Sequence, residues 1–128
     1  MEKQTIDLGT VTLQWSDWFP WDSIKADARF PGGISIPNFK SGVYEVIRKG
    51  EEKRLTIGKA SNLRMRIRQG LVKGKTKHSA GTKIRRNENT SLLLVRWAET
   101  EKPAGVEEHL HRLYVERFGE WPFCTDHT

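Results

Sequence analysis

The stretch LTIGKASNLRMRIRQG, residues 55–70, constrains the possible folds most strongly. An apolar run ends at a Gly-Lys pair, Ser61 or Asn62 is placed to cap a helix, and three arginines follow before Gly70. This order predicts a strand, a tight turn and a basic helix that stops at Gly70. A strand, a turn and a basic helix in this order are a common way to build a phosphate site.

The segments on either side predict the rest of a small sheet. GVYEVIRK (42–49) and KRLTIG (53–58), joined by a short turn, predict a β-hairpin. SLLLVRWAE (91–99) predicts a buried strand, and PAGVEEHLHRLYVERF (103–118) predicts a helix with Pro103 in its first turn. The spacing of apolar residues in this helix predicts a buried face made of Val106, Leu110, Leu113 and Tyr114.

Residues 1–39 predict an N-terminal arm on a domain formed by residues 40–128, and a chain of 128 residues fits one compact domain. TVTLQW (10–15) alternates like a short strand, and residues 28–42 contain the prolines and glycines of a loop. Between them lie three tryptophans, Trp15, Trp18 and Trp21. Such a cluster can stack on exposed nucleic acid bases, but it more often packs an arm onto its own domain, as we predict here.

Positive charge dominates the chain, because 22 Lys and Arg against 16 Asp and Glu give a net charge of +6. This charge indicates a polyanionic partner, although a cationic surface that only serves solubility fits the charge alone equally well. A basic segment, residues 72–90, is rich in Gly and Lys. The residues predicted to contact nucleic acid are Thr56, Arg64, Arg68, Lys73, Lys75, Lys77, Lys83, Arg85 and Arg86.

Several classes of protein and site do not fit the sequence. A single cysteine, Cys124, excludes an intrachain disulfide and is typical of a reducing compartment. The sequence has no signal-peptide core and no apolar run of membrane length, so we expect a cytoplasmic protein with no membrane partner. The histidines lack structural-zinc spacing, and neither a phosphate-binding Gly-rich loop nor a serine-nucleophile elbow is found.

Two helical faces carry candidate site residues. After Asn62, Leu63 and Ile67 must face the core, and Arg64 and Arg66 flank them almost symmetrically. Either arginine can reach a site at the sheet edge, and both can instead extend over the apolar stripe to solvent.

The last helix places Glu107 at the border of its buried face, one turn before His111 on the same flank. Glu108 faces solvent, where it can pair with Arg112. A carboxylate at such a border can hold a hard divalent cation, or it is simply solvated or salt-bridged.

Taken in order, these motifs resemble the GIY-YIG endonuclease superfamily. Its first signature corresponds to GVY (42–44) and its second to TIG (56–58). The stretch GKASNLRMR (58–66) is similar to the turn and helix of the bacterial excision-repair nuclease domain. Glu107 takes the position of the late helical glutamate, so the resemblance covers about residues 40–122.

The resemblance implies an α/β (α+β) domain built on a central three-stranded antiparallel sheet flanked by helices. It also implies hydrolysis of phosphodiester bonds in DNA with Mg²⁺ or Mn²⁺, RNA not being excluded. A single site of this kind cuts one strand, so double-strand cleavage would need a homodimer or two binding events.

The resemblance also implies the role of each site residue. It selects Arg66 rather than Arg64, and Arg66 and Lys59 would bind the scissile phosphate and stabilise transition-state charge. Tyr44 would be the general base or would hold the attacking water, with a pKa lowered by these two cations. Glu107 would hold the divalent ion, which stabilises the leaving oxygen.

Three positions depart from the family pattern. Thr56 stands where the second signature has tyrosine, Gly70 stands where Tyr or His follows the arginine, and no asparagine matches the one that assists Glu107. His78 can replace the missing histidine, or it belongs to a phosphate-binding loop. The departures support a second hypothesis, a non-catalytic nucleic-acid-binding module on the same scaffold, which metal-dependent turnover would distinguish.

Overall fold

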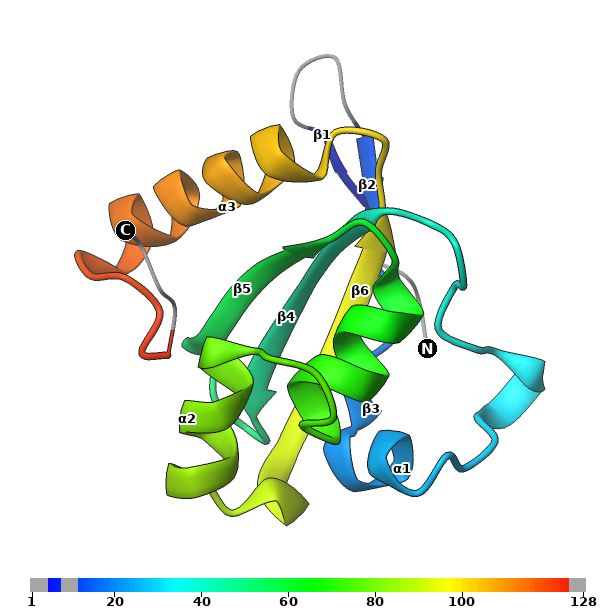
Figure 1. The fold of residues 1–128 in the computed structure, drawn as a ribbon. Coiled ribbons are helices and arrows are strands. Elements are labelled where there is room, and N and C mark those ends of the chain that lie inside the picture. The colour runs from blue at the N-terminus through cyan, green and yellow to red at the C-terminus, as the bar shows by residue number, and fades with distance from the viewer. Residues whose placement is uncertain (1–4, 8–11, 125–128) are drawn as a thin grey trace.

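The computed structural model describes residues 5–7 and 12–124 of the chain. At its centre is an antiparallel sheet with the strand order β3-β6-β4-β5 (Figure 1). β4 (Gly42–Arg48) pairs with β5 (Arg54–Ala60) on one side and with β6 (Leu93–Glu99) on the other. β5 is therefore an edge strand of this sheet within the described residues.

This architecture confirms a mixed α/β class and adds one short strand to the three that were predicted. β3 (Phe19–Pro20) comes from the N-terminal arm, and its Phe19 pairs with Val95 of β6. Periodicity could not reveal β3, because two residues ending in proline show no alternation. The predicted β4–β5 hairpin is present, and its turn contains Gly50 at φ 83°, in the left-handed region that favours glycine.

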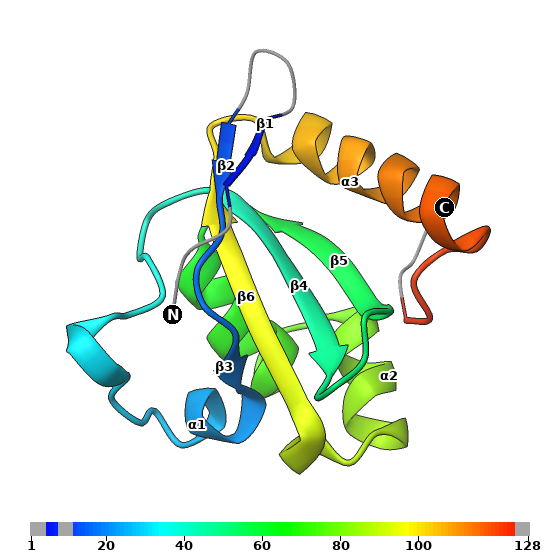
Figure 2. The ribbon, with the colours of Figure 1, turned by 180° about the vertical axis from the view of Figure 1, so that it is seen from behind.

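Helices cover both faces of the sheet (Figure 1 and Figure 2). α1 (Trp21–Lys25), the π-helical segment η2 (Met65–Val72) and α2 (Ser79–Asn87) cover the face that carries Tyr44. α3 (Pro103–Phe118) packs against the opposite face. The remaining short elements are β1 (Thr5–Asp7), β2 (Thr12–Gln14), η1 (Pro31–Gly33) and η3 (Thr90–Leu92).

The tryptophans of the arm pack onto the sheet. Trp15 and Trp21 are buried, and Trp18 is half buried. The Arg96 guanidinium of β6 lies 4.2 Å from the ring centroid of Trp15 and 4.5 Å from that of Trp18. The two buried indoles are therefore not available to stack on bases. β2 lies within the predicted strand 10–15, of which residues 10 and 11 lie outside the described residues.

The helix after β5 differs from the prediction at its end. Of the two possible caps, Asn62 is used, because its Oδ1 accepts a hydrogen bond from the Met65 backbone N–H at 3.4 Å. Gly70 does not stop the helix, which continues for two more residues. Gly70 is buried in a crowded place, and Gly74, at φ 68°, takes the left-handed position after the helix end.

The basic segment 72–90 is not only a loop, because it contains α2. His78 is the N-cap of α2, and its Nδ1 accepts a hydrogen bond from the Gly81 N–H at 3.0 Å. Arg85 of α2 donates to the carbonyl oxygens of Gly70 at 3.0 Å and Leu71 at 2.5 Å, so α2 is fastened to η2. A short helix that contains a glycine has weak intrinsic propensity, and tertiary contacts of this kind stabilise it.

α3 has the predicted bounds, but its buried face is rotated from the predicted one. Leu113 is 40% exposed, and His111 is buried instead. The His111 Nε2–H donates to the backbone oxygen of Ile57 on β5 at 2.9 Å. An edge strand has carbonyl groups that no neighbouring strand uses, and binding one of them turns the helix toward His111. The predicted pair of Glu108 and Arg112 is present at 3.5 Å.

Two further expectations concern the whole chain. Cys124 is a free, buried thiol, and its backbone N–H donates to the Leu55 oxygen of β5 at 2.6 Å. Across residues 5–7 and 12–124, the structure contains no helix with the length and apolar character to cross a membrane.

Candidate active site

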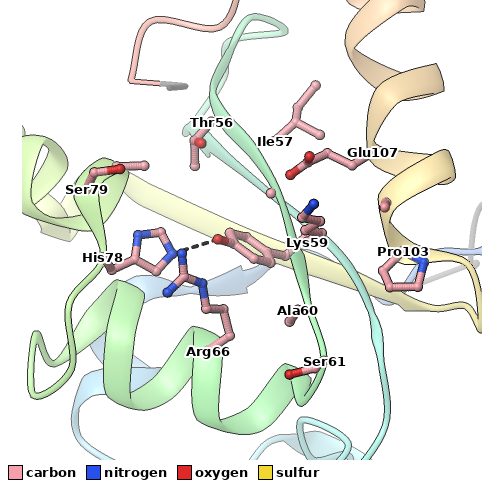
Figure 3. A pocket seen from close by; sticks show the side chains of 14 residues that line it. Thr56, Ile57, Lys59, Ala60, Ser61, Arg66, His78, Ser79, Pro103 and Glu107 are labelled. Atoms are coloured by element: carbon pink, nitrogen blue, oxygen red, sulfur yellow. Dashed lines mark hydrogen bonds between the residues drawn. The ribbon is translucent and has the colours of Figure 1, made fainter. Parts of the chain in front are cut away.

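A pocket of about 730 Å³ opens at the outer edge of β5. η2 and the start of α2 border it on one side, and the first turns of α3 border it on the other (Figure 3). The residues predicted to act in catalysis come from different elements, and all of them line this pocket. They are Tyr44, Lys59, Arg66, His78 and Glu107.

Tyr44 reaches the pocket because glycine stands opposite it. Tyr44 and Gly58 are partners in the β4–β5 ladder, and a Cβ at Gly58 would lie 2.3 Å from the Tyr44 hydroxyl oxygen. No side chain fits in that space, so Gly58 allows the phenol ring to lie across β5. The glycine of the TIG motif thus has a packing role that sequence alone did not reveal.

The Tyr44 hydroxyl is hydrogen-bonded to His78 at 2.6 Å between Oη and Nε2 (dashed line in Figure 3). Because the Gly81 N–H already donates to Nδ1, the proton of the neutral imidazole lies on Nε2. Nε2–H therefore donates to the Tyr44 oxygen, and the hydrogen of the phenol is left to donate to a third group in the pocket.

Burial sets the charge of this pair. Desolvation, together with the nearby charges of Arg66 and Arg85, lowers the pKa of His78 to about 4. Desolvation, only partly offset by Arg66, raises the pKa of Tyr44 to about 12. The sequence predicted the opposite net direction for Tyr44, because a sequence shows the cations but not the burial. Both groups are neutral at pH 7.

Gly70, one of the departures from the GIY-YIG pattern, lies against His78, the possible replacement for the missing histidine. A Cβ at Gly70 would lie 3.3 Å from His78 Cδ2 and 3.1 Å from Thr76 Oγ1, which is tighter than ordinary contact. The absence of a side chain at Gly70 therefore makes room for the imidazole that bonds Tyr44. Thr56, another of the departures, is buried in the wall of the same pocket.

The charged side chains of the pocket make few polar contacts with the rest of the protein. The Arg66 Nη1 donates to the Lys77 carbonyl at 3.1 Å, and its guanidinium lies beside His78 (Figure 3). Lys59 is exposed, and Glu107 is half buried with its carboxylate turned toward β5. In the part of the chain that the structure describes, no ion pair engages Lys59 or Glu107.

Four of the cations predicted to bind nucleic acid hold the fold together, namely Arg64, Arg68, Lys73 and Arg85. Arg64 donates to the Ile36 carbonyl at 2.8 Å and to Ser35 Oγ at 3.4 Å. Arg68 and Lys73 pair with Asp27 at 3.2 and 2.5 Å, and they lower the pKa of its carboxyl. The other predicted cations are exposed, namely Lys75, Lys77, Lys83 and Arg86.

A divalent ion would have one carboxylate ligand here. Within residues 5–7 and 12–124, no group of three His, Cys, Asp or Glu side chains is placed to hold a metal. Mg²⁺ commonly keeps several waters and binds one or two carboxylates together with substrate phosphate oxygens. The Glu107 carboxylate, which makes no ion pair among the described residues and lines the same pocket as Lys59 and Arg66, fits that mode of binding, in which the substrate completes the coordination.

Sequence reasoning did not predict two polar residues of the pocket. Ser61, after β5, and Ser79, the first residue of α2, also line the pocket. Ser79 follows His78 directly, so a correct prediction of α2 would have placed it. Ser61 was considered only as a helix cap.

Comparison with models of known protein families, with curated proteins and with solved structures finds no match.

Proposed function

We propose that this protein is a metal-dependent DNA endonuclease of the GIY-YIG type, which hydrolyses phosphodiester bonds. The observation that carries the proposal is the convergence on one pocket of a phenol, an imidazole, two cations and a carboxylate, with no ion pair engaging these charges among the described residues. Local sequence pattern does not require residues from different elements to meet in this way. The family resemblance and the net charge of +6 agree with an anionic substrate.

Arg66 and Lys59 bind the scissile phosphate in this proposal. Arg66 provides a planar guanidinium that can contact two phosphate oxygens, whereas Lys59 acts as a point charge. Both stabilise the additional negative charge of the transition state. Their lack of carboxylate partners in the described residues is what such a role needs, because an ion pair within the protein would compete with the phosphate.

Tyr44 positions the attacking water and accepts its proton. Tyr44 is a neutral phenol at pH 7, so the small phenolate fraction is the base form. The Nε2–H of His78 donates to the phenolate oxygen, and Arg66 stabilises the same charge. His78 is a positioning residue in this arrangement rather than a base, because the Gly81 N–H occupies its other nitrogen.

Glu107 would hold Mg²⁺ or Mn²⁺, which supplies charge stabilisation for the leaving oxygen. One such site cuts one strand, so the basic outcome is a nick. Cutting of both strands would require a homodimer or a second binding event, and RNA is an alternative substrate for the same chemistry.

The test is a plasmid-nicking assay in Mg²⁺ and in Mn²⁺. We expect cleavage by the wild-type protein and its loss in Glu107→Gln and Arg66→Ala. Lys102→Ala, an exposed residue just before α3, is a matched charge control that should retain cleavage. Nicking that survives both pocket substitutions would exclude this site as its source.

A second candidate function is a non-catalytic module that binds nucleic acid. It is favoured by Thr56 at the place of the second signature tyrosine and by a Tyr44 pKa of about 12, which makes the phenolate scarce. This candidate predicts salt-sensitive binding, through counterion release, and no cleavage with any metal. Metal-dependent turnover would decide against it.

A further inference from the structure

Phe39 is a large apolar side chain that the fold holds out in solvent. It is 84% exposed and has φ 61°, in the left-handed region that bulky residues rarely adopt. Neither property helps the chain to fold, because the side chain buries little area and the backbone is strained. An outlier of this kind points to a role outside folding.

The loop around Phe39 is clamped by hydrogen bonds. Asn38 Oδ1 accepts from the Asn62 side chain at 3.1 Å, and the Lys40 carbonyl accepts from the Leu63 N–H at 2.9 Å. The preceding residue Pro37 accepts from the Arg64 N–H at 3.0 Å. Phe39 is therefore displayed by a braced turn rather than by a loose one.

The same clamp continues on both flanks. The Arg64 side chain bonds Ile36 and Ser35, and Ser41 exchanges two hydrogen bonds with Thr100, at 2.6 and 3.0 Å. Arg64 was predicted to contact nucleic acid, but here it braces the loop.

The loop that carries Phe39 meets the chain next to the pocket, because Asn38 is hydrogen-bonded to Asn62, which follows the pocket residue Ser61. Gly42, three residues later, pairs with Ala60, and Ala60 and Ser61 both line the pocket. Three residues span at most about 11 Å. Figure 1 shows this loop entering β4 at the end of the sheet from which α3 begins. Lys40, the next residue after Phe39, is also exposed and adds a cation to this loop.

We propose that Phe39 stacks on an unpaired base of the nucleic acid that binds in the pocket. Aromatic side chains beside cations are the usual platform for single-stranded bases. A base in an intact duplex is already stacked on both faces, so Phe39 selects a substrate with an unpaired base a few nucleotides from the scissile phosphate, such as a flap or a single-stranded end. The inference rests on the proposed function for the position of the phosphate.

The test measures binding without metal, in EDTA, so that it does not depend on cleavage. The probes are a labelled duplex with a single-stranded flap and a fully paired duplex of the same length. We expect the wild-type protein to bind the flapped probe about tenfold more tightly, since stacking on one base commonly changes affinity by about 5- to 100-fold.

Phe39→Ala should lose this preference, whereas Phe39→Trp should retain it because an indole also stacks. Phe123→Ala is the matched control, because Phe123 is 70% exposed but lies beside Arg48 and Leu55, near the other end of β5. Circular dichroism establishes that each variant is folded. Fluorescence of 2-aminopurine at the flap junction should change with the wild-type protein and not with Phe39→Ala.

The possible results separate the two proposals. If Phe39→Ala binds both probes like the wild type, or loses both equally, base stacking is overturned. If it instead changes the oligomeric state by sedimentation and leaves binding unaltered, Phe39 is a contact between copies and the inference also fails. Nicking by the wild type that depends on Glu107 would still support the endonuclease in either case. Flap preference that depends on Phe39 in a protein that never cleaves would support stacking and overturn the endonuclease.

Discussion

Tyr44 and Glu45 are neighbours on β4, and their side chains face opposite sides of the sheet. Tyr44 opens into the pocket, where Lys59 and Glu107 make no ion pair within the described residues. Glu45 is 4% exposed and pairs with Arg96 at 2.6 Å and Arg54 at 3.1 Å. The charges of Glu45, Arg54 and Arg96, the closed cluster, are therefore paired within the protein. Lys59 and Glu107, the open cluster, line the pocket at the outer edge of β5 and are left open.

The closed cluster is sealed by the N-terminal arm. Arg96 is 5% exposed, and Trp15 and Trp18 lie on its guanidinium. Trp18 also lies 5.3 Å from the Arg54 guanidinium carbon. Buried charges are tolerated only when they are paired, so this cluster serves the structure. Charges that line a cavity without partners are available to a ligand, and the comparison thus separates a structural ion cluster from a candidate site.

The largest effect should come from breaking the closed cluster. Glu45→Gln removes the buried carboxylate charge that pairs with Arg96 and Arg54, and we expect a loss of about 3–5 kcal/mol in the free energy of unfolding. This corresponds to a melting temperature lower by about 10–20 °C. Urea and thermal denaturation measure it. Glu108→Gln, in the exposed pair with Arg112, is the control and should change stability by about 0.5 kcal/mol at most. Equal effects of the two substitutions would contradict the comparison.

His78 is a buried pocket residue with hydrogen bonds to Tyr44 and Gly81, and its contribution to stability should depend on pH in the acid range. Its pKa is lowered from 6.5 to about 4 in the folded protein, so between these pH values the unfolded chain binds a proton that the native state does not. Stability must therefore fall as the pH drops from about 6.5 to about 4, by about 3 kcal/mol in total. Urea unfolding across this range should show that loss in the wild type and not in His78→Gln. Parallel pH profiles would show that His78 is not buried as a neutral group.

Sequence reasoning predicted the long elements, and it failed where contacts between distant residues decide the structure. β4, β5, β6 and α3 were predicted because their apolar periods extend over seven residues or more. α2 was missed because it is stabilised by the hydrogen bonds of its own Arg85 to η2, and local sequence pattern does not show such a contact. His111 replaced Leu113 in the buried face because of a carbonyl on β5 that the helical wheel cannot represent.

The site shows the same limit. The ordered motifs named Tyr44, Lys59, Arg66 and Glu107, and the structure brings all of them to one pocket. The direction of the Tyr44 pKa was wrong, since desolvation depends on neighbours that the sequence does not identify. The closed cluster was missed altogether, because its pairing requires adjacent strands and an arm to meet. The order of motifs in the sequence predicts which side chains gather in the pocket. Their protonation states depend on burial, which the sequence does not show.

The open cluster predicts the reverse of the Glu45 result. Glu107→Gln should reduce nicking by at least about 100-fold, because one charged group acting on the transition state is removed. The free energy of unfolding should change by about 0.5 kcal/mol or less, because no ion pair of the described residues is lost. Nicking and urea unfolding on the same preparation test both statements. A destabilisation as large as that of Glu45→Gln would mean that Glu107 belongs to the fold.

The pH dependence of cleavage tests the protonation states of Tyr44 and His78 in the pocket. If Tyr44 acts as a phenolate with a pKa of about 12, the rate should rise about tenfold per pH unit between pH 6 and pH 9. His78 should add no step near pH 6.5, because it stays neutral above about pH 5. Single-turnover rates across this range provide the measurement, with Tyr44→Phe as the comparison. A rate that levels near pH 7 would exclude a buried phenol as the base.

The smallest effect concerns Phe39, whose backbone is strained without any gain in packing. Asparagine tolerates a left-handed backbone better than phenylalanine does, so Phe39→Asn should raise the free energy of unfolding by about 0.5–1 kcal/mol. The same substitution should weaken binding to the flapped probe. Thermal denaturation and binding, measured together, would show stability and function moving in opposite directions at one residue. A loss of stability would instead place Phe39 with Glu45, among the residues that the fold itself requires.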